Sequence, residues 1–353
     1  MMGFTRRRGA VRLGAYLGGL GVLAGTAVLG GGVAVAATPG GPTAIVSMGD
    51  SAISGEGAGD YQAGTDGPVD FCHRSVHAEI NRAVIPGVVR AINLACSGAA
   101  SANVRIGGAS HYTEPSQVDQ LRAVAAHNDV KMIVLQLGAN DDPAFSSVVL
   151  ACVQAWANPF ATGCRGSVGP SWPGRVAAAE PKVAASIGDI RAVMRAEGYA
   201  DADYAFVLQS YASPVTEHMN RLLHAVQGCP VRIDDANWGR TVAVPELAAG
   251  LRAVAERTGV RFLDLSRATE NHEACNSDGL AHWQNPLVID VSKIPAGLNL
   301  HVVQQSFHPN AAGHGQFGRC LAEFYADGAA QARCVAGADG NLHARVTAVT
   351  ASG

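Results

Sequence analysis

Five short apolar segments, spread along most of the chain, constrain its fold more than any other feature of the sequence. Each is five or six residues long, the usual length of a strand. Apolar residues fill nearly every position, which is typical of strands that are buried on both faces of a parallel sheet. The segments are residues 43–48, 91–95, 132–137, 204–209 and 260–265. They predict five strands of one buried sheet.

Helical patterns lie between and after these segments. Residues 116–127, 175–197 and 244–258 repeat apolar side chains at helical spacing, and Gly259 suits a helix C-terminus. We expect a last helix over residues 311–326. Alternation of strands and helices predicts an α/β fold, here a three-layer α/β/α sandwich with a mostly parallel five-stranded sheet.

Three segments do not fit this alternation. Residues 55–68 are polar and rich in glycine, residues 143–173 contain four prolines and two cysteines, and residues 270–305 contain three histidines. Long irregular segments in a compact domain are usually functional loops. We therefore expect long loop insertions at about 143–173 and 270–305.

Residues 1–36 have the pattern of a signal peptide. Four arginines lie within residues 6–12, an apolar stretch follows over about residues 13–35, and residues 34–36 read Ala-Val-Ala, which suits a cleavage site. The apolar stretch is long enough to span a bilayer, so a retained membrane anchor is the alternative. We expect cleavage and secretion of residues 37–353 as a single domain, with no permanent membrane anchor.

Removal of this leader makes the chain more acidic. The full chain has a net charge of −3, and the leader carries four arginines and no acidic residue, so the mature chain has a charge of about −7. A mildly acidic surface argues against nucleic acid or anionic lipid as an electrostatic partner. We expect a monomer.

The eight cysteines all follow the leader. An even number of cysteines in an exported chain favours disulfides. Roughly a hundred pairings are possible for eight cysteines, so the sequence does not decide among them. We expect each cysteine to pair with its neighbour along the chain, as Cys72–Cys96, Cys152–Cys164, Cys229–Cys275 and Cys320–Cys334. A zinc site is the alternative, but no CxxC pair is present, and we expect no metal.

Chemically useful residues follow the ends of three predicted strands. Ser51 follows the first in Gly-Asp-Ser, Gly98 follows the second in Cys-Ser-Gly, and Asn140 follows the third in Gly-Ala-Asn-Asp. His308 precedes the last predicted helix in Ser-Phe-His-Pro-Asn. Each motif alone is more often a turn or a helix cap. Because ligands bind beyond the carboxyl ends of parallel strands, the four together predict one site at that edge of the sheet.

This set of motifs resembles the four sequence blocks of the SGNH hydrolases, also called the GDSL esterase/lipase family. The resemblance extends over about residues 43–325. The spacing of the blocks, the pair Cys72 and Cys96, and the Cys-Ser-Gly-Ala stretch are most similar to the secreted actinobacterial branch. The resemblance implies an SGNH or flavodoxin-like sandwich that hydrolyses esters.

The resemblance also implies a role for each of the four residues. Ser51 would be the nucleophile and His308 its general base. The backbone N–H groups of Ser51 and Gly98 and the side-chain amide of Asn140 would form the oxyanion hole. The chemistry agrees, because a serine hydroxyl needs a base and the tetrahedral oxyanion needs preorganised donors. No cofactor is expected.

One position departs from the family pattern. Family members usually carry an aspartate three residues before the histidine, and this chain has Gln305 there. We therefore expect a Ser–His dyad in which the backbone carbonyl of Gln305 or Ser306 orients His308. A carbonyl fixes the tautomer but stabilises an imidazolium less than a carboxylate does. Asp290 is a remote alternative.

Other side chains have weaker assignments. Asp50 is expected to brace the nucleophile turn. Three tryptophans are candidates for an apolar wall that binds an acyl group, with core packing as the alternative. Three histidines of the second insertion are candidates for the lining of the pocket. These residues are Trp156, Trp172 and Trp283, and His272, His282 and His301.

The expected function is that of a secreted serine esterase or lipase. It would hydrolyse carboxylic esters with lipid or short acyl groups through an acyl-enzyme on Ser51. An acetyl esterase acting on polysaccharide or cell-wall glycans is an alternative that the same four blocks permit. A non-catalytic surface-binding protein on a degenerate hydrolase scaffold is a second alternative, because the usual aspartate is missing.

Overall fold

The computed structural model describes residues 40–296 and 300–347. The predicted signal peptide, residues 1–36, lies outside the described residues and stays a prediction. No helix in the described part of the chain combines the length and the apolar character that crossing a membrane requires.

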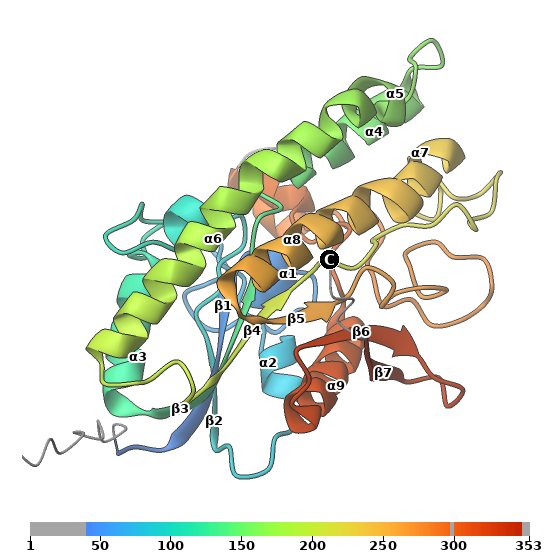
Figure 1. Ribbon diagram of the computed structural model, residues 1–353. Helices are drawn as coiled ribbons and strands as arrows, with labels where there is room; N and C mark the ends of the chain where they lie inside the picture. Colours follow the sequence, from blue (N-terminus) through green and yellow to red (C-terminus); the bar gives the residue numbers. More distant parts are fainter. Residues whose placement is uncertain (1–39, 297–299, 348–353) are drawn as a thin grey trace, which may run out of the picture. The chain divides into compact units, whose positions relative to one another are not determined.

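A seven-stranded sheet forms the centre of the fold (Figure 1). The strands lie in the order β2-β1-β3-β4-β5-β6-β7, and every neighbouring pair is parallel except β6 and β7. The strands are β1 Thr43–Gly49, β2 Arg90–Asn93, β3 Asp129–Gln136, β4 Ala205–Gln209, β5 Arg261–Asp264, β6 Gln331–Ala336 and β7 Leu342–Val346. The first five match the five predicted strands. The predicted number of five was wrong, because two further strands extend the β5 edge.

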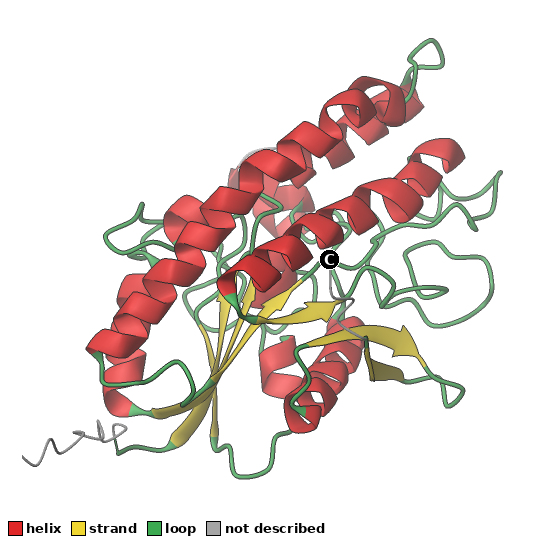
Figure 2. Ribbon diagram, in the orientation of Figure 1, coloured by secondary structure: helices red, strands yellow, loops and turns green. Residues whose placement is uncertain are grey.

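Helices cover both faces of the sheet, which confirms the predicted α/β/α sandwich (Figure 2). The four predicted helices correspond to α3, α6, α8 and α9. The helices are α1 Ser51–Ser54, α2 Glu79–Arg82, α3 Gln117–His127, α4 Phe145–Ala157, α5 Cys164–Val168, α6 Trp172–Ala196, α7 Ile233–Trp238, α8 Val244–Thr258 and α9 Ala311–Asp327. A π-helical turn, Gly239–Ala243, joins α7 to α8.

The alternation of side chains along β3 explains the two layers of core. Ile133 and Leu135 pack with α3, α6 and α8, whereas Met132 and Val134 pack with α2 and α9. Successive side chains of a strand point to opposite faces, so a strand of continuous apolar residues needs cover on both sides.

The two predicted insertions differ from each other. Residues 143–173 are not a long loop, since they contain α4 and α5 and the start of α6. Three of the four prolines there stand before or between the α-helices, and Pro173 lies in the first turn of α6, where a proline does not break a hydrogen-bonded turn. The described part of residues 270–305 is irregular, with turns and two short 3₁₀ helices, Val291–Ala296 and Leu300–Val303.

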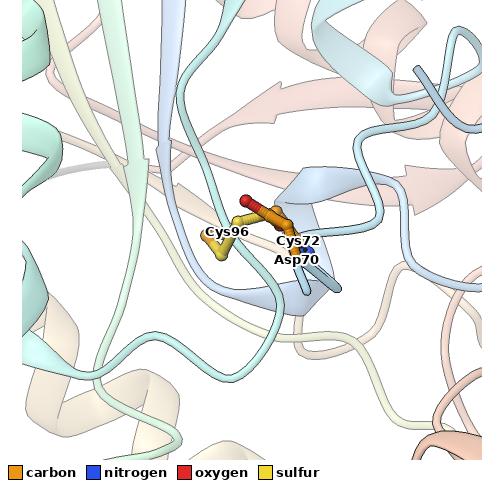
Figure 3. Close-up of side chains that lie close together, drawn as sticks. All are labelled: Asp70, Cys72 and Cys96. Atoms are coloured by element: carbon orange, nitrogen blue, oxygen red, sulfur yellow. Dashed lines mark hydrogen bonds between the residues drawn. A yellow bond between two sulfur atoms is a disulfide. The ribbon is translucent and has the colours of Figure 1, made fainter. Parts of the chain in front are cut away.

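The cysteines form four disulfides with the expected partners. The bonds are Cys72–Cys96, Cys152–Cys164, Cys229–Cys275 and Cys320–Cys334. Asp70 lies beside the first of these pairs, in a group with the spacing of metal ligands (Figure 3). Both sulfur atoms of that group are bonded to each other, so neither is a thiolate that could hold zinc. Four disulfides suit an oxidising, extracellular environment.

Candidate active site

Ser51 lies at the carboxyl end of β1, which runs between β2 and β3, and it is the first residue of α1. The turn before it requires a glycine. Gly49 has a φ of 131°, and a Cβ atom there would lie 1.9 Å from the carbonyl oxygen of Gln136 on β3. Asp50 then caps α1, because its carboxylate accepts a hydrogen bond of 3.1 Å from the N–H of Ala52. The strand end and the cap together fix the position of the Ser51 side chain.

Asp50 is a buried brace, as expected from the sequence. Its carboxylate accepts a second hydrogen bond from the Tyr211 hydroxyl, which in turn accepts one of 3.2 Å from the N–H of Ala139. Burial raises the pKa of Asp50 from 3.8 to about 7, against the opposing effects of the bonds from Tyr211 and Ala52. This network links the turn before Ser51 to the residue that precedes Asn140.

His308 contacts Ser51 directly. Its Nε2 atom lies 2.8 Å from the Ser51 hydroxyl oxygen, and its Nδ1 atom lies 3.0 Å from the carbonyl oxygen of Ser306. A carbonyl accepts only, so Nδ1 carries the proton and Nε2 is free to accept the serine proton. Of the two carbonyls predicted to orient the ring, Ser306 and not Gln305 makes the contact. Asp290 does not contact the ring, and its carboxylate accepts from Ser292 instead.

The backbone beside His308 is held in an uncommon conformation. Phe307 has a φ of 60°, which is rare for a bulky side chain. Asn285 bonds both sides of the histidine, because its carbonyl accepts from the Phe307 N–H at 3.1 Å and its N–H donates to the His308 carbonyl at 2.9 Å. Uncommon backbone conformations of this kind occur where the surroundings fix them, often at functional sites.

The surroundings of His308 keep its ring neutral. Burial lowers the pKa of His308 below its usual value of 6.5, while the charge of Glu56 and the carbonyls of Ser306 and Gln304 oppose that effect. A neutral imidazole at neutral pH is the form that can accept a proton. The Ser51–His308 pair therefore has the geometry and the protonation state of a nucleophile and its base.

Three hydrogen-bond donors lie at the ends of the adjacent strands β2, β1 and β3. Ser51 is the first residue of α1, so its N–H has no acceptor within the helix. The N–H of Gly98 has no acceptor among the described residues, and its φ of 84° favours glycine. The side-chain amide of Asn140 donates 3.0 Å to the carbonyl of Ala99, which joins the second and third motifs. This arrangement suits the oxyanion hole expected from the sequence.

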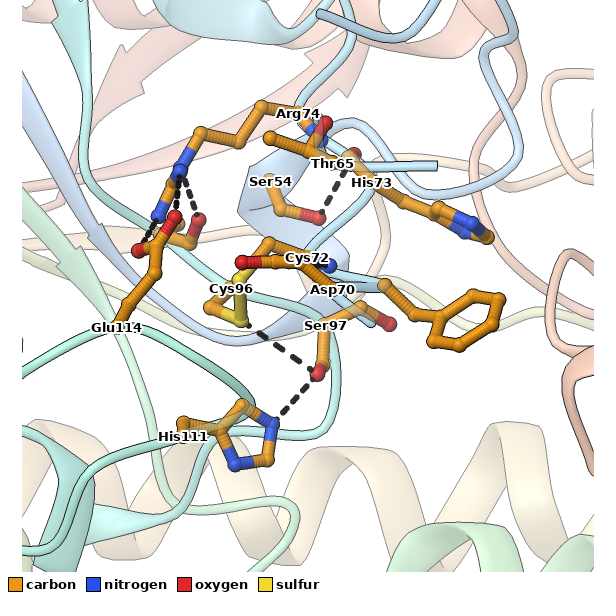
Figure 4. Close-up of a disulfide and its surroundings, with 12 residues drawn as sticks. Ser54, Thr65, Asp70, Cys72, His73, Arg74, Cys96, Ser97, His111 and Glu114 are labelled. Carbon is orange, nitrogen blue, oxygen red and sulfur yellow. Dashed lines mark hydrogen bonds and ion pairs between the residues drawn. A yellow bond between two sulfur atoms is a disulfide. The ribbon is translucent and has the colours of Figure 1, made fainter. Parts of the chain in front are cut away.

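The disulfide Cys72–Cys96 holds the Gly98 segment in place (Figure 4). The N–H of Ser97 donates 3.0 Å to the Cys72 carbonyl, and the N–H of Cys96 donates 3.1 Å to the carbonyl of Gly49. Beside the disulfide, the Arg74 guanidinium donates a hydrogen bond of 2.9 Å to the carbonyl of Ala95 and forms an ion pair with Glu114. The loop after α1 is thus bonded to the Gly98 segment at several points.

An apolar cavity opens beside Ser51 and His308. It runs between α4, the start of α6, and the α7–α8 segment. Aliphatic and aromatic side chains make up most of its wall, including Phe145, Val148, Val149, Trp172, Val215, Val231, Trp238, Val244 and Leu247. Of the three predicted wall tryptophans, only Trp172 lies there. Trp156 is 41% exposed on α4, and Trp283 is buried against the ring of His272.

The three histidines of the second insertion do not line this cavity. His272 stacks on Trp283 with ring centres 3.6 Å apart, and His301 stacks on Phe71 at 3.7 Å. The Nε2 atom of His282 lies 3.1 Å from the carbonyl oxygen of Asn276. The expectation that these rings line the pocket was therefore wrong, since they pack loops instead.

The sequence reasoning missed several residues that support the site. Tyr211, Asn285 and Gln304 carry no motif, and each acts through a contact with a residue far away along the chain. The sequence shows only that each of the three is a polar residue inside an irregular segment or just after a strand. Such residues are too common for this signal to single out Tyr211, Asn285 and Gln304. Glu56 was also missed, although the sequence did offer a signal for it: it lies five residues after Ser51, in a Gly-rich loop.

Comparison with known proteins identifies the family. The model of the GDSL-like Lipase/Acylhydrolase family matches residues 47–316. Lipase 2 of Streptomyces coelicolor is 25% identical over 202 residues, which cover 56% of this chain and 60% of that protein, so the chain spans about three fifths of that relative's length.

Solved structures that are similar to this one include two from Streptomyces. The extracellular lipase of Streptomyces rimosus has 20% identity and a TM-score of 0.48, and phospholipase A1 of Streptomyces albidoflavus NA297 has 22% identity and a TM-score of 0.49. Each comparison covers 77% of this chain and 94% of the other. The family match extends from β1, just before Ser51, into α9, beyond His308. The chain therefore belongs to the GDSL-like lipase/acylhydrolase family, a family of carboxylic ester hydrolases.

Proposed function

We propose that this protein is a secreted serine esterase that hydrolyses carboxylic esters with an apolar acyl chain. The observation that carries the proposal is the 2.8 Å contact between Ser51 and His308 beside an apolar cavity. Family membership supports the reaction class, and the four disulfides support secretion.

The reaction would proceed in two halves. The Ser51 oxygen attacks the ester carbonyl while its proton moves to Nε2 of His308, and the N–H groups of Ser51 and Gly98 with the Asn140 amide bind the oxyanion. The C–O bond to the alcohol then breaks, and His308 returns the proton to the leaving alkoxide. Water repeats the sequence on the acyl-enzyme, which releases the carboxylic acid and restores Ser51.

The lining of the cavity favours acyl chains over acetyl groups. An acetyl group would leave most of the apolar wall without a partner, whereas each methylene that leaves water contributes about 0.8 kcal/mol. That energy corresponds to roughly a fourfold gain in binding per methylene. Phe145, Val148, Trp172 and Leu247 are among the large apolar side chains of this wall. A glycan substrate, by contrast, needs polar side chains and exposed aromatic platforms.

An acyl-chain series tests the proposal. With p-nitrophenyl esters from acetate to dodecanoate, kept below their aggregation limits, kcat/KM should rise about fourfold per methylene over the first few carbons and then level off. A preference for acetate with a falling series would support the glycan acetyl esterase instead. Absence of turnover on every ester, with no labelling of Ser51 by a fluorophosphonate, would support the non-catalytic alternative.

Two serine variants form a matched pair for the nucleophile. Ser51→Ala should abolish turnover while the melting temperature stays near that of the wild type. Ser146→Ala removes another hydroxyl that lines the same cavity and should leave kcat within about twofold. Turnover by Ser51→Ala at the wild-type rate would contradict the assignment.

A further inference from the structure

The His308 ring has a carbonyl where a triad has a carboxylate. The Ser306 carbonyl fixes the tautomer, but it carries no full charge to stabilise the imidazolium that forms when Ser51 loses its proton. A buried carboxylate nearby would supply that charge from a distance, because electrostatic interactions inside a protein are less screened than in water. Glu56 is a buried carboxylate whose charge acts on His308 in this sense.

Glu56 is completely buried on the loop that follows α1. Its carboxylate accepts hydrogen bonds from His73 Nδ1 at 2.8 Å and from Gln304 Nε2 at 2.9 Å. A buried polar group without hydrogen-bond partners is costly, and these contacts supply partners for the carboxylate. Glu56 also favours the protonated form of His308, since its charge opposes the lowering of that residue's pKa by burial.

The backbone beside Glu56 packs directly against His308. A Cβ atom on Gly57 would lie 3.1 Å from the Cβ of His308 and 3.1 Å from the carbonyl oxygen of Pro309. The side-chain amide of Asn285 donates 2.8 Å to the Gly57 carbonyl, and the Asn285 backbone bonds the histidine segment. The loop that carries Glu56 is therefore joined to the catalytic histidine by contact and by a shared asparagine.

Gln304 connects the carboxylate to the turn that carries the Ser306 carbonyl. Its Nε2 atom lies 2.9 Å from Glu56, 3.0 Å from the carbonyl of Phe71 and 2.8 Å from the hydroxyl of Ser97. Ser97 precedes Gly98, so the same amide also contacts the segment of the proposed oxyanion hole. Movement of Glu56 would thus displace the acceptor that orients His308.

We propose that Glu56 is a positioning residue that takes over the task of the missing third carboxylate. It fixes the turn containing residues 304–306 through Gln304, and its charge stabilises protonated His308 without touching the ring. This inference rests on the proposed function, because it assigns a task in the Ser51–His308 reaction.

Other charged groups lie close enough to modify the effect. The charge of His73 acts on His308 in the opposite sense to that of Glu56. Burial lowers the pKa of His314 to about 3, so that ring is neutral during catalysis. The titratable groups that face Glu56 and His308 from the packed segments include His73, Tyr61, Tyr112 and His314. Asp66 lies on the far side of His73, and Lys293 pairs with Asp66.

The test measures the pH profile of kcat/KM on one p-nitrophenyl ester. Glu56→Gln keeps the shape of the side chain and removes its charge. The acid limb should move down by about half to one pH unit, less than the one to three units typical of a direct contact. Because a weaker base takes the proton less readily, kcat should fall roughly three- to tenfold, with KM unchanged.

Two further variants separate charge from position. Glu56→Asp retains the charge but draws it away from Gln304, so it should restore the acid limb while kcat stays low. Gln304→Leu keeps Glu56 and breaks the connection to the turn, so it should lower kcat and leave the limb within about 0.2 units of the wild type. If Glu56→Gln does not fold, these two variants still test the proposal.

Asp66→Asn is the matched control, because it removes the other carboxylate beside His73. It should leave the limb and kcat unchanged. The inference is wrong if Glu56→Gln keeps the wild-type limb, if Asp66→Asn shifts it equally, or if Glu56→Gln only lowers the melting temperature. If Ser51→Ala or His308→Ala retains turnover, the proposed function itself is wrong. That result can be told apart from the three outcomes above, which concern only Glu56→Gln and Asp66→Asn.

Discussion

The hydroxyl of Tyr211 gives a sharp test of how the site is built. It donates to the buried carboxylate of Asp50 and accepts from the N–H of Ala139, so one oxygen joins the turn before Ser51 to the segment before Asn140. Tyr211→Phe removes this oxygen and little else. Asp50 keeps a single bond, from Ala52, and the Ala139 N–H loses its acceptor.

The size of the effect follows from these two contacts. A hydrogen bond to a charged group contributes about 1.5–3 kcal/mol, and a buried donor left without a partner costs about 1–3 kcal/mol. We therefore expect Tyr211→Phe to lower the free energy of unfolding by about 3 kcal/mol at pH 8, where Asp50 is ionised. The amide of Asn140 should also lose its exact placement, so kcat should fall about tenfold.

The loss should depend on pH, because Asp50 titrates near neutrality. The pKa of Asp50 is raised in the folded protein from 3.8 to about 7. Between these two pH values the folded protein binds more protons than the unfolded chain. The contribution of Asp50 to the free energy of unfolding therefore falls as the pH rises from 3.8 to about 7. At pH 5 Asp50 is neutral and its bond from Tyr211 is worth only about 1 kcal/mol. The cost of Tyr211→Phe should therefore be about 1–2 kcal/mol smaller at pH 5 than at pH 8.

Urea unfolding at the two pH values measures this difference, and the chain offers a matched control. The hydroxyl of Tyr204 is buried and has no hydrogen-bond partner among the described residues. Tyr204→Phe should be neutral or stabilising by up to about 1 kcal/mol at both pH values. Equal losses for Tyr211→Phe at pH 5 and pH 8, or a loss no larger than that of Tyr204→Phe, would refute the reasoning.

Three further predictions concern the histidine, the turn and the disulfide of the site. His308→Ala should lower kcat by about 10³-fold or more, whereas Gln305→Ala should leave p-nitrophenyl ester hydrolysis nearly unchanged, because Ser306 and not Gln305 contacts the ring. Gly49→Ala should prevent accumulation of soluble folded protein, since its methyl group would overlap a backbone carbonyl of β3. Replacing Cys72 and Cys96 with alanine should lower the free energy of unfolding by about 3 kcal/mol in urea titrations.

The sheet could be predicted where continuous apolar segments of the sequence mark its strands. β1 to β5 consist of apolar runs, and all five were found. Buried residues of β6 alternate with less buried ones, and β7 at the edge of the sheet has one buried residue, so a search for continuous apolar segments passes over both strands. The helices α4 and α5 were missed because prolines and glycines around them suggested a loop, although proline is compatible with the first turn of a helix.

The site was predictable where strand ends define it. Ser51, Gly98 and Asn140 follow adjacent parallel strands, so the topology alone brings their motifs together. The identity of the carbonyl beside His308 was not predictable, because Gln305 and Ser306 differ only in how the turn is folded. Tyr211 and Gln304 were beyond reach for the same reason, since their contacts depend on tertiary packing.

The sheet and the loop after α1 have separate tasks in this site. The ends of β1 and β3 determine where Ser51 and Asn140 lie, and Gly49 at the end of β1 also accepts a hydrogen bond from the N–H of Cys96. The other two parts of the site are His308 and the segment of Gly98. The loop joins both, through the Cys72–Cys96 disulfide and through the contacts of Glu56. Because a disulfide persists only where the surroundings are oxidising, the geometry of the site depends on the compartment. A reducing cytoplasm would leave the sheet intact and loosen the segment on which the proposed oxyanion hole depends, which ties the proposed activity to secretion.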